Sequence, residues 1–178
     1  MVLPAAHAVA LHACPMPALV ALGPLLCLHH AADPHLLSGW RRARRLVAQV
    51  QLDSDGPCEA LRFYDESGQC CWRLHLLPDS DFHAWELLLS RLPVLPEVRH
   101  GAALGPLAVR GLRARWRASA LRLHAVAGSG IAAPARLAAT DVELSPLGQA
   151  CARRIARESG AFAAPGPGTP AWDAASPH

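Results

Sequence analysis

The sequence predicts an α+β domain in which an antiparallel β-sheet carries packed helices. Within residues 60–92, two runs with the period-two alternation of strands flank a tight turn, and a capped helical pattern follows them. Residues 145–158 repeat the signals of a capped helix. Strands joined by a short turn pair antiparallel, so we expect the sheet to be built around this hairpin.

The hairpin is predicted to have one apolar face and one polar face. In the first strand, 60–64, Leu61 and Phe63 alternate with Arg62 and Tyr64. The turn 65–68 ends in Gly68, which is free to adopt positive φ. In the second strand, 70–76, alternation places one set of residues on the apolar face (Cys70, Trp72, Leu74 and Leu76) and the other on the polar face (Cys71, Arg73 and His75).

A helix over 81–92 is expected to cover the apolar face. Asp79 or Ser80 can cap this helix, and Asp81 suits its positive end. Pro93 ends it. Its apolar residues recur at helical spacing: Phe82, Trp85, Leu88, Leu89 and Leu92.

The helix predicted over 145–158 is well signalled, with Ser145 as its cap and Pro146 as its first residue. The remaining elements have fewer local signals. The segment 107–127 reads as a strand or, alternatively, as a helix over 110–124. We expect one domain over 1–159, with 1–15 loosely ordered, and a disordered Pro/Gly/Ala tail over 160–178. The other expected elements are a short helix over 16–22, a strand over 25–28, a helix over 34–47 and a strand over 47–52.

Composition argues against nucleic-acid binding and against a membrane span. All 17 basic residues are Arg, and the net charge of +3 is mild, whereas a nucleic-acid binder shows a concentrated basic face. Residues 1–28 carry no Asp, Glu, Lys or Arg, but prolines interrupt the apolar run that a spanning helix would need. A signal peptide is the alternative interpretation of this segment, although no Lys or Arg precedes the apolar run.

No motif in the chain is a self-sufficient catalytic or metal signature. The six cysteines form no CxxC pair, which favours thiols in a reducing cytosol over a disulfide in an exported protein. His29, His30, Asp33 and His35 resemble a metal-ligand cluster, but adjacent histidines on a strand diverge and zinc spacing is absent. GxSxG, P-loop and HExxH motifs are also absent. A self-contained hydrolase or transferase is therefore not expected.

Residues 60–92 resemble the hemin-transport and hemin-degrading family of HemS, HmuS and ChuS proteins, and their shorter relatives of the HutX and ChuX type. The likeness is gapless and rests on the Phe63-Tyr64 pair, Asp65, Gly68, Arg73, Ser80-Asp81 and Trp85. A weaker likeness covers 21–31. The resemblance implies a single compact HemS-like module, and a cytoplasmic bacterial protein that binds heme during uptake or intracellular trafficking.

The resemblance also implies a heme cofactor and candidate residues for holding it. The family's axial histidine sits on a helix that begins shortly after a Leu-rich, Trp-containing segment, and His124 after 112–116 looks similar. His100, which precedes the segment 120–123, is a second candidate. His75 lies on the polar hairpin face and is a third, although a solvated or locally satisfied histidine is the alternative. Arg62 and Arg73 could meet the heme propionates, as could the Arg row at 113, 115 and 117.

Three functions remain open at this point. The leading hypothesis is a carrier without turnover, whose partners would be heme and a heme transporter or heme-receiving protein. The second is reductant-dependent heme degradation, which needs an open sixth position on the iron. The third is an interaction module that keeps the scaffold and has lost heme binding.

Overall fold

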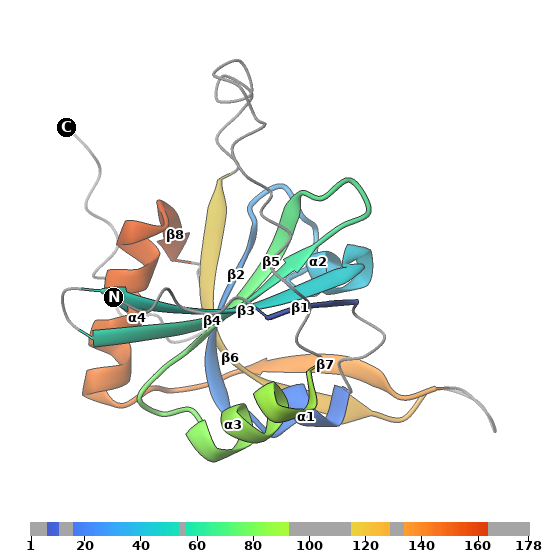
Figure 1. Cartoon of the computed structure of the whole chain (residues 1–178). Coiled ribbons are helices and arrows are strands. Elements are labelled where there is room, and N and C mark those ends of the chain that lie inside the picture. The colour runs from blue at the N-terminus through green and yellow to red at the C-terminus, as the bar shows by residue number, and fades with distance from the viewer. Residues whose placement is uncertain (1–6, 11–15, 54–55, 93–114, 129–133, 164–178) are drawn as a thin grey trace.

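A computed structural model describes residues 7–10, 16–53, 56–92, 115–128 and 134–163. Within them, eight strands form one sheet in the order β1-β3-β4-β5-β2-β6-β7, and β8 pairs with β6 outside this path. All pairs are antiparallel except β6–β8. The predicted α+β class with an antiparallel sheet and packed helices is confirmed (Figure 1).

Where the sequence alternates between apolar and polar residues, this alternation matches the bounds of the strand. Elsewhere the bounds are set by pairing with the neighbouring strands. The strands are β1 (His7–Ala10), β2 (Pro24–His30), β3 (Arg45–Asp53), β4 (Gly56–Tyr64), β5 (Cys70–Leu76), β6 (Trp116–Val126), β7 (Arg136–Asp141) and β8 (Ala161–Ala163). The strand interpretation of 107–127 is therefore correct for 116–126. The short strands β1 and β8 lie within segments predicted to be loosely ordered and disordered.

The helices are α1 (Met16–Val20), α2 (Ser38–Arg42), α3 (Phe82–Arg91) and α4 (Pro146–Glu158). The predicted helix over 34–47 is wrong over most of its length, because Arg44 donates its backbone N–H to the Tyr64 carbonyl and β3 begins at Arg45. In α4, the Ser145 hydroxyl accepts from the Gly148 N–H, as the capping signal predicts.

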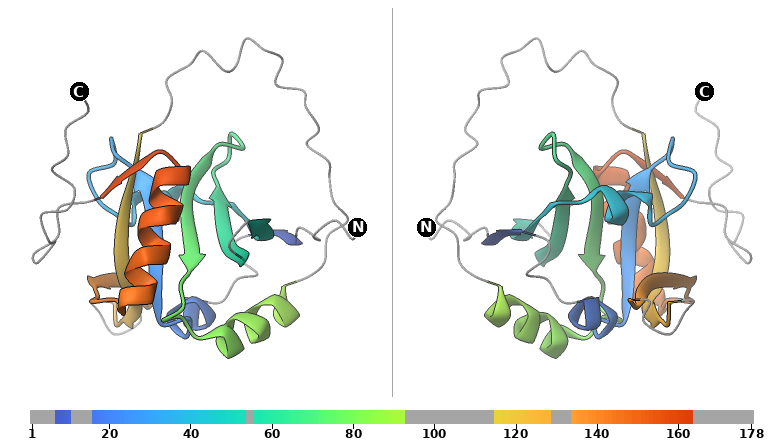
Figure 2. Two further views of the ribbon diagram at one scale, coloured as in Figure 1. Left: turned by 90° about the vertical axis from the view of Figure 1, so that its left-hand side faces the viewer. Right: turned by 90° about the vertical axis from the view of Figure 1, so that its right-hand side faces the viewer.

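Two apolar clusters lie on opposite faces of the sheet. The larger one contains Trp72, Phe63 and Leu74 and is covered by α1, α2 and α3. Trp40 of α2 packs its ring at 5.8 Å from Phe63. The smaller one contains Leu26, Leu28 and Trp116 and is covered by Ile155 of α4. Figure 2 shows α4 in front of one face and α2 in front of the other.

A β-bulge at Cys71 changes which cysteine lies on which face. Phe63 is opposite Trp72, but Tyr64 is opposite Cys70, so Cys71 is an extra residue on β5. Cys71 is buried in the larger cluster, and Cys70 packs against the smaller one. The two thiols do face opposite sides, but the predicted assignment of each to its side is reversed.

Residues of the short loop after β5 form hydrogen bonds to the first residues of α3, α4 and β2. The Asp81 side chain accepts from the Ala84 N–H and is the cap of α3. The Ser80 hydroxyl accepts from the Leu77 N–H at 2.8 Å and donates to the Pro24 carbonyl at 2.5 Å. Asp79 binds the start of α4 instead. The predicted capping of α3 by Asp79 or Ser80 is thus replaced by Asp81.

Candidate functional site

Three of the predicted site residues meet on one face of the β4–β5 hairpin. Arg62 is directly opposite Arg73, and Ala60 is directly opposite His75. Residues two apart on a strand share a face, so Arg62, Arg73 and His75 lie on the side of the smaller cluster. We call Arg62, Arg73, His75 and the neighbouring Cys58 the hairpin cluster.

His75 is buried, in contrast to the solvated or locally satisfied histidine that is the alternative from sequence. Only 7 % of it is exposed, and its Nε2 has no hydrogen-bond partner among the described residues. Its Nδ1 lies 3.7 Å from the Cys58 Sγ. Burial, followed by the charges of Arg73 and Arg62, lowers the pKa of His75 to about 3. The imidazole is therefore neutral at physiological pH.

The two arginines differ in how firmly they are held. The Arg73 guanidinium lies 4.3 Å from the ring centroid of Trp116, and its Nε donates to the Cys70 Sγ at 3.5 Å. The Trp116 ring in turn contacts the His30 ring at 4.3 Å. Arg62 Nε is buried without a partner in the described part of the chain. The hairpin cluster thus carries two cations. Stacking fixes the Arg73 guanidinium, whereas the Arg62 Nε is a donor without an acceptor among the described residues.

The sheet face around the hairpin cluster is buried on one side and half-buried on the other. On the β2–β6 side, Leu26 and Leu28, the cross-strand neighbours of His75 and Arg73, are buried in the smaller cluster, to which Ile155 of α4 also belongs. On the β3–β4 side the residues of this face are half-buried: Arg45, Val47, Gln49, Cys58, Arg62 and Tyr64. Figure 2 shows β4 and β5 beside α4 rather than beneath its whole width. His75 lies at the border of the two regions.

The other predicted ligands do not join this cluster. His124 lies on β6, where its Nε2 is 2.6 Å from the Thr140 Oγ1. Pairing places Leu26 opposite both His75 and Ala120. His124 is four residues beyond Ala120, so the Cα atoms of His75 and His124 are about 16 Å apart, from about 4.8 Å per strand and about 3.3 Å per residue. His100 and Arg113 lie outside the described residues, whereas Arg115 stacks at 4.7 Å on the Phe162 ring and Arg117 is exposed on β6.

The histidines near the end of β2 do not form a metal site. His29 donates from Nδ1 to the His30 carbonyl, and His30 donates from Nε2 to the Cys70 carbonyl at 3.0 Å. Asp33 is paired with Arg42 at 2.6 Å. In the part of the chain that the structure describes, no group of three or more His, Cys, Asp or Glu residues is placed to hold a metal ion.

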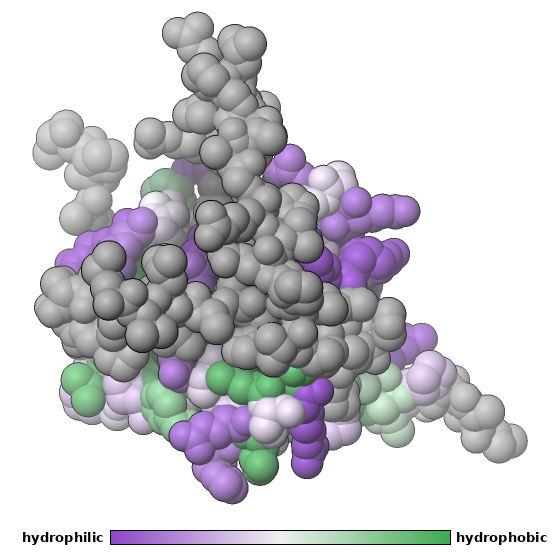
Figure 3. Space-filling view, viewed as in Figure 1, coloured by the Kyte–Doolittle hydropathy of each residue, from purple (hydrophilic) through white to green (hydrophobic). Residues whose placement is uncertain are grey.

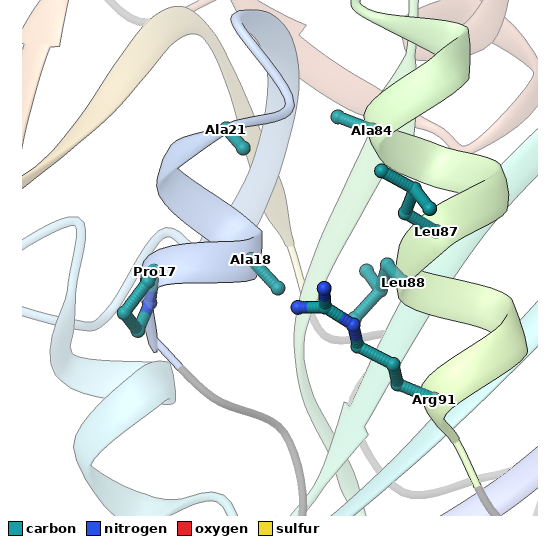
Figure 4. A pocket seen from close by; sticks show the side chains of 7 residues that line it. All are labelled: Pro17, Ala18, Ala21, Ala84, Leu87, Leu88 and Arg91. Carbon is teal, nitrogen blue, oxygen red and sulfur yellow. The ribbon is translucent and has the colours of Figure 1, made fainter.

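A groove at the other end of the molecule is too small for a cofactor. It lies between α1 and α3, and Figure 4 shows Leu87 and Leu88 facing Ala18, with Arg91 reaching across the mouth. Its volume of about 140 Å³ is below the roughly 300 Å³ at which ligand pockets begin. On the surface shown in Figure 3, hydrophobic residues emerge along the lower edge, where α1 and α3 lie.

One of these features is visible in the sequence and two are not. Alternation along the strands predicts the shared face of Arg62, Arg73 and His75. The contact between Cys58 and His75 depends on the β4–β5 register, and the burial of His75 depends on cover from elsewhere in the chain. Neither has a local signal. Within the described residues, no helix has the length and apolar character to cross a membrane.

No family model and no curated protein matches the chain. Solved structures match part of it, among them the following three. The holo form of PhuS, a heme-binding protein from Pseudomonas aeruginosa, is 22% identical over 55% of this chain and 39% of its own, with a TM-score of 0.37. The heme-degrading enzyme ChuS of Escherichia coli O157:H7 is 15% identical over 46% and 33%, also at 0.37. Apo-PhuS is 19% identical over 51% and 34%, at 0.31. This chain therefore covers less than half of each of them.

Proposed function

We propose that this protein binds heme at the hairpin cluster. The observation that carries the proposal is the unpartnered Nε2 of His75, which lies on the same sheet face as two arginines. Heme requires a neutral imidazole nitrogen for iron, cations for its propionates and apolar surface for its ring. The hairpin cluster offers the imidazole and the cations, and Val47 and Tyr64 are the half-buried residues beside it that would meet the ring.

His75 has the chemistry of an axial ligand. Its lowered pKa keeps the ring neutral, so one nitrogen carries a lone pair at pH 7. With the proton on Nδ1, the N–H points toward the Cys58 sulfur, and the lone pair is on Nε2. Iron ligands of this kind are commonly oriented by a hydrogen bond from the second ring nitrogen, and Cys58 would fill that role here.

Arg62 and Arg73 are the proposed partners of the propionates. They are adjacent across the β4–β5 pair, and in the described part of the chain neither forms a salt bridge with a carboxylate. An arginine can bind a carboxylate through two parallel hydrogen bonds. The stacking of Arg73 on Trp116 restricts its motion, which reduces the entropy lost on binding. Val47 of β3 and Tyr64 of β4, which are half-buried on the same sheet face, would contact the porphyrin edge.

His124 is the second candidate for the axial ligand. It is more accessible than His75, but binding iron through Nε2 would break its contact with Thr140. The separation of about 16 Å, from strand geometry, means that both histidines cannot bind one iron. His100 is the third candidate. We propose that the protein acts in bacterial heme uptake or intracellular heme trafficking in the cytoplasm, with a heme transporter or heme-receiving protein as partner.

A hemin titration followed in the Soret region tests the proposal. The wild-type chain is compared with single alanine substitutions of His75, His124 and His100, and with His83→Ala as the matched control, because His83 is exposed on α3. We expect a saturable one-to-one shift that His75→Ala abolishes and His83→Ala preserves. Circular dichroism confirms that each variant is folded.

The other outcomes of the titration are equally definite. Loss of the shift in His124→Ala or His100→Ala alone would move the ligand to that residue. A wild-type response equal to that of a non-binding protein would exclude heme binding. Incubating the complex with a reductant separates the carrier from the degrading enzyme, because only the enzyme would form ring-opened product.

A scaffold without heme is the second candidate function. The burial of the His75 Nε2 favours it, since an iron ligand must be reachable. Under this hypothesis the domain acts through its surface, and the histidine and arginines serve only the fold. The absence of any heme spectrum from a folded chain would support it.

A further inference from the structure

The Arg73 side chain extends across the sheet, in the direction away from Arg62. Arg73 on β5 is directly opposite Leu28 of β2, and β2 pairs in turn with β6, the strand that carries Trp116. The Arg73 guanidinium lies 4.3 Å from the ring centroid of Trp116. Arg62 lies on β4, the strand on the opposite side of β5. The cation of Arg73 is therefore held on the β2–β6 side of its own strand.

A closed series of contacts fixes this position of Arg73. The Trp116 ring packs against the His30 ring, with the two centroids 4.3 Å apart. His30 Nε2 donates to the Cys70 carbonyl at 3.0 Å, and the Cys70 Sγ accepts from the Arg73 Nε at 3.5 Å. The series links β2, β5 and β6, so a displacement of the guanidinium would break contacts on three strands. We call Trp116, His30 and Cys70 the Arg73 support.

The Arg73 support leaves most of the guanidinium available to a ligand. Arginine has five N–H donors, and the support engages the one on Nε. In the described part of the chain, no salt bridge occupies the rest of the group. Arg73 is half-buried, whereas the Trp116 side chain on which it stacks is only 7 % exposed. The attraction between the cation and the ring thus holds Arg73 in place without using its terminal donors.

We propose that Trp116 is a positioning residue that holds the Arg73 cation apart from Arg62, so that the hairpin cluster selects a ligand with two separated carboxylates. The inference rests on the proposed function, because heme is a ligand whose two propionates have this form. Each arginine, when it is held apart from the other, can bind one carboxylate through two parallel hydrogen bonds. Two guanidinium groups that were free to meet would instead close on a single compact anion such as phosphate.

Protoporphyrin IX is a probe that tests the inference without iron. It carries the two propionates of heme and no metal, so its binding does not depend on a histidine ligand. Its dimethyl ester lacks both negative charges, and inorganic phosphate is a compact anion. Porphyrin fluorescence gives the dissociation constants of the acid and of the ester from the full chain, and phosphate is added in excess as a competitor.

Two substitutions of Trp116 separate its aromatic face from its bulk. Trp116→Leu removes the face on which Arg73 stacks, and Trp116→Phe keeps an aromatic ring there. Phe162→Leu is the matched control, because it removes the ring on which Arg115 stacks at 4.7 Å, outside the hairpin cluster. Circular dichroism confirms that each variant is folded.

We expect wild type to bind the acid about tenfold more tightly than the ester, and phosphate should not displace the acid. Trp116→Leu should lower this ratio to about twofold by weakening the binding of the acid. Trp116→Phe and Phe162→Leu should keep the ratio within about twofold of wild type. An ester that binds as tightly as the acid, displacement by phosphate, or an equal ratio in wild type and Trp116→Leu would overturn the inference.

Nuclear magnetic resonance tests the positioning of Arg73 without any ligand. The Nε–H signal of Arg73 is identified by its absence in Arg73→Lys, and its exchange with water is slow while the guanidinium is held against the Cys70 sulfur. We expect Trp116→Leu to speed this exchange about threefold and Trp116→Phe to preserve it. An unchanged rate in Trp116→Leu would overturn the role of Trp116. If Trp116→Leu does not fold, His30→Ala takes its place in both measurements, because it removes the ring that packs against Trp116.

A parallel hemin titration separates this inference from the proposed function. If hemin binds without dependence on His75 while the acid is still preferred over the ester, the axial ligand is wrong and the selection of two carboxylates stands. If hemin binds through His75 but the acid and the ester bind equally, heme binding stands and the role of Trp116 is overturned. A folded chain that binds neither hemin nor protoporphyrin would overturn both.

Discussion

Arg62 on β4 and Arg73 on β5 are direct cross-strand neighbours, with their side chains on the face that carries His75. Like charges placed opposite each other in a sheet are destabilising. The same two charges contribute to the lowered pKa of His75. A ligand with two carboxylates would relieve the repulsion between the two arginines. The free energy by which this repulsion destabilises the ligand-free protein can be measured.

Replacing Arg62 by methionine should stabilise the ligand-free protein. Methionine keeps most of the aliphatic stem and removes one of the two charges, so the unfolding free energy should rise by about 0.2–1 kcal/mol. Urea denaturation at low ionic strength measures the change. Arg45→Met, which removes an arginine stacked at 4.9 Å on Tyr64, is the control and should not stabilise. A less stable Arg62→Met would mean that Arg62 already has a counter-charge.

Stability should fall as the pH is lowered below about 6.5. The pKa of His75 is about 3 in the folded chain because of burial, and burial also lowers the pKa of His29. The unfolded state therefore binds protons that the folded state excludes, and each such group removes about 1.4 kcal/mol per pH unit between its two pKa values.

Replacing His75 by glutamine isolates its share of this pH dependence. Between pH 6 and pH 4, the slope of the unfolding free energy should decrease by about 1.4 kcal/mol per pH unit relative to wild type. Urea denaturation at several pH values measures both slopes. Identical slopes would show that His75 is protonated in the folded chain and is reachable by water.

Glu59 should act on stability in the opposite direction. Its Oε2 is buried without a partner in the described residues, and burial, followed by the charge of Glu86, raises its pKa. The folded state thus favours the protonated form, so this contribution is present at acid pH and is lost as the pH rises through the folded pKa. Glu59→Gln should stabilise the protein at pH 7 by on the order of 1 kcal/mol, and much less at pH 4.

Thermal or chemical unfolding of Glu59→Gln at the two pH values checks this expectation. Glu86→Gln, on exposed α3 surface, is the matched variant and should have a smaller effect. Equal stabilisation by Glu59→Gln at both pH values would show that the effect comes from packing rather than from charge.

Substituting Gly148 by alanine should destabilise α4. Alanine is the better helix former by about 1 kcal/mol, but its Cβ would collide with the Asp79 carboxylate. Overpacking of this kind costs about 1–3 kcal/mol, so a net loss is expected in denaturant unfolding. In the Asp79→Ala background the collision is absent, and Gly148→Ala should then stabilise. A loss in both backgrounds would place the clash elsewhere.

Local signals predict the hairpin, α3 and α4, because each combines a turn or cap with a periodic apolar pattern. The helix expected over 34–47 fails for a tertiary reason: helix α2 ends at Arg42, and residues 45–47 pair with β4 as the start of β3. The short β1, β7 and β8 have no such signal, since their stability comes from the strands beside them. Two adjacent residues, Cys70 and Cys71, exchange faces because a bulge breaks the alternation.

The composition of the candidate site is predictable to a lesser degree. The shared face of Arg62, Arg73 and His75 follows from alternation alone. The burial of His75 depends on tertiary cover, for which the alternation along β5 carries no signal. The role of Asp79 is likewise hidden, because Ser145, which donates both hydrogen bonds to its carboxylate, lies 66 residues away.

Because of the bulge at Cys71, β5 has one residue more than a regular ladder needs, yet its other side chains keep the faces that they would have in a regular ladder. Because the extra residue is absorbed where Tyr64 meets Cys70, Trp72, Leu74 and Leu76 keep their inward direction. Loss of that one residue would restore a regular ladder without turning Arg73 or His75 to the opposite side. Relatives of this domain could therefore differ by a single insertion or deletion here and still present the same side chains.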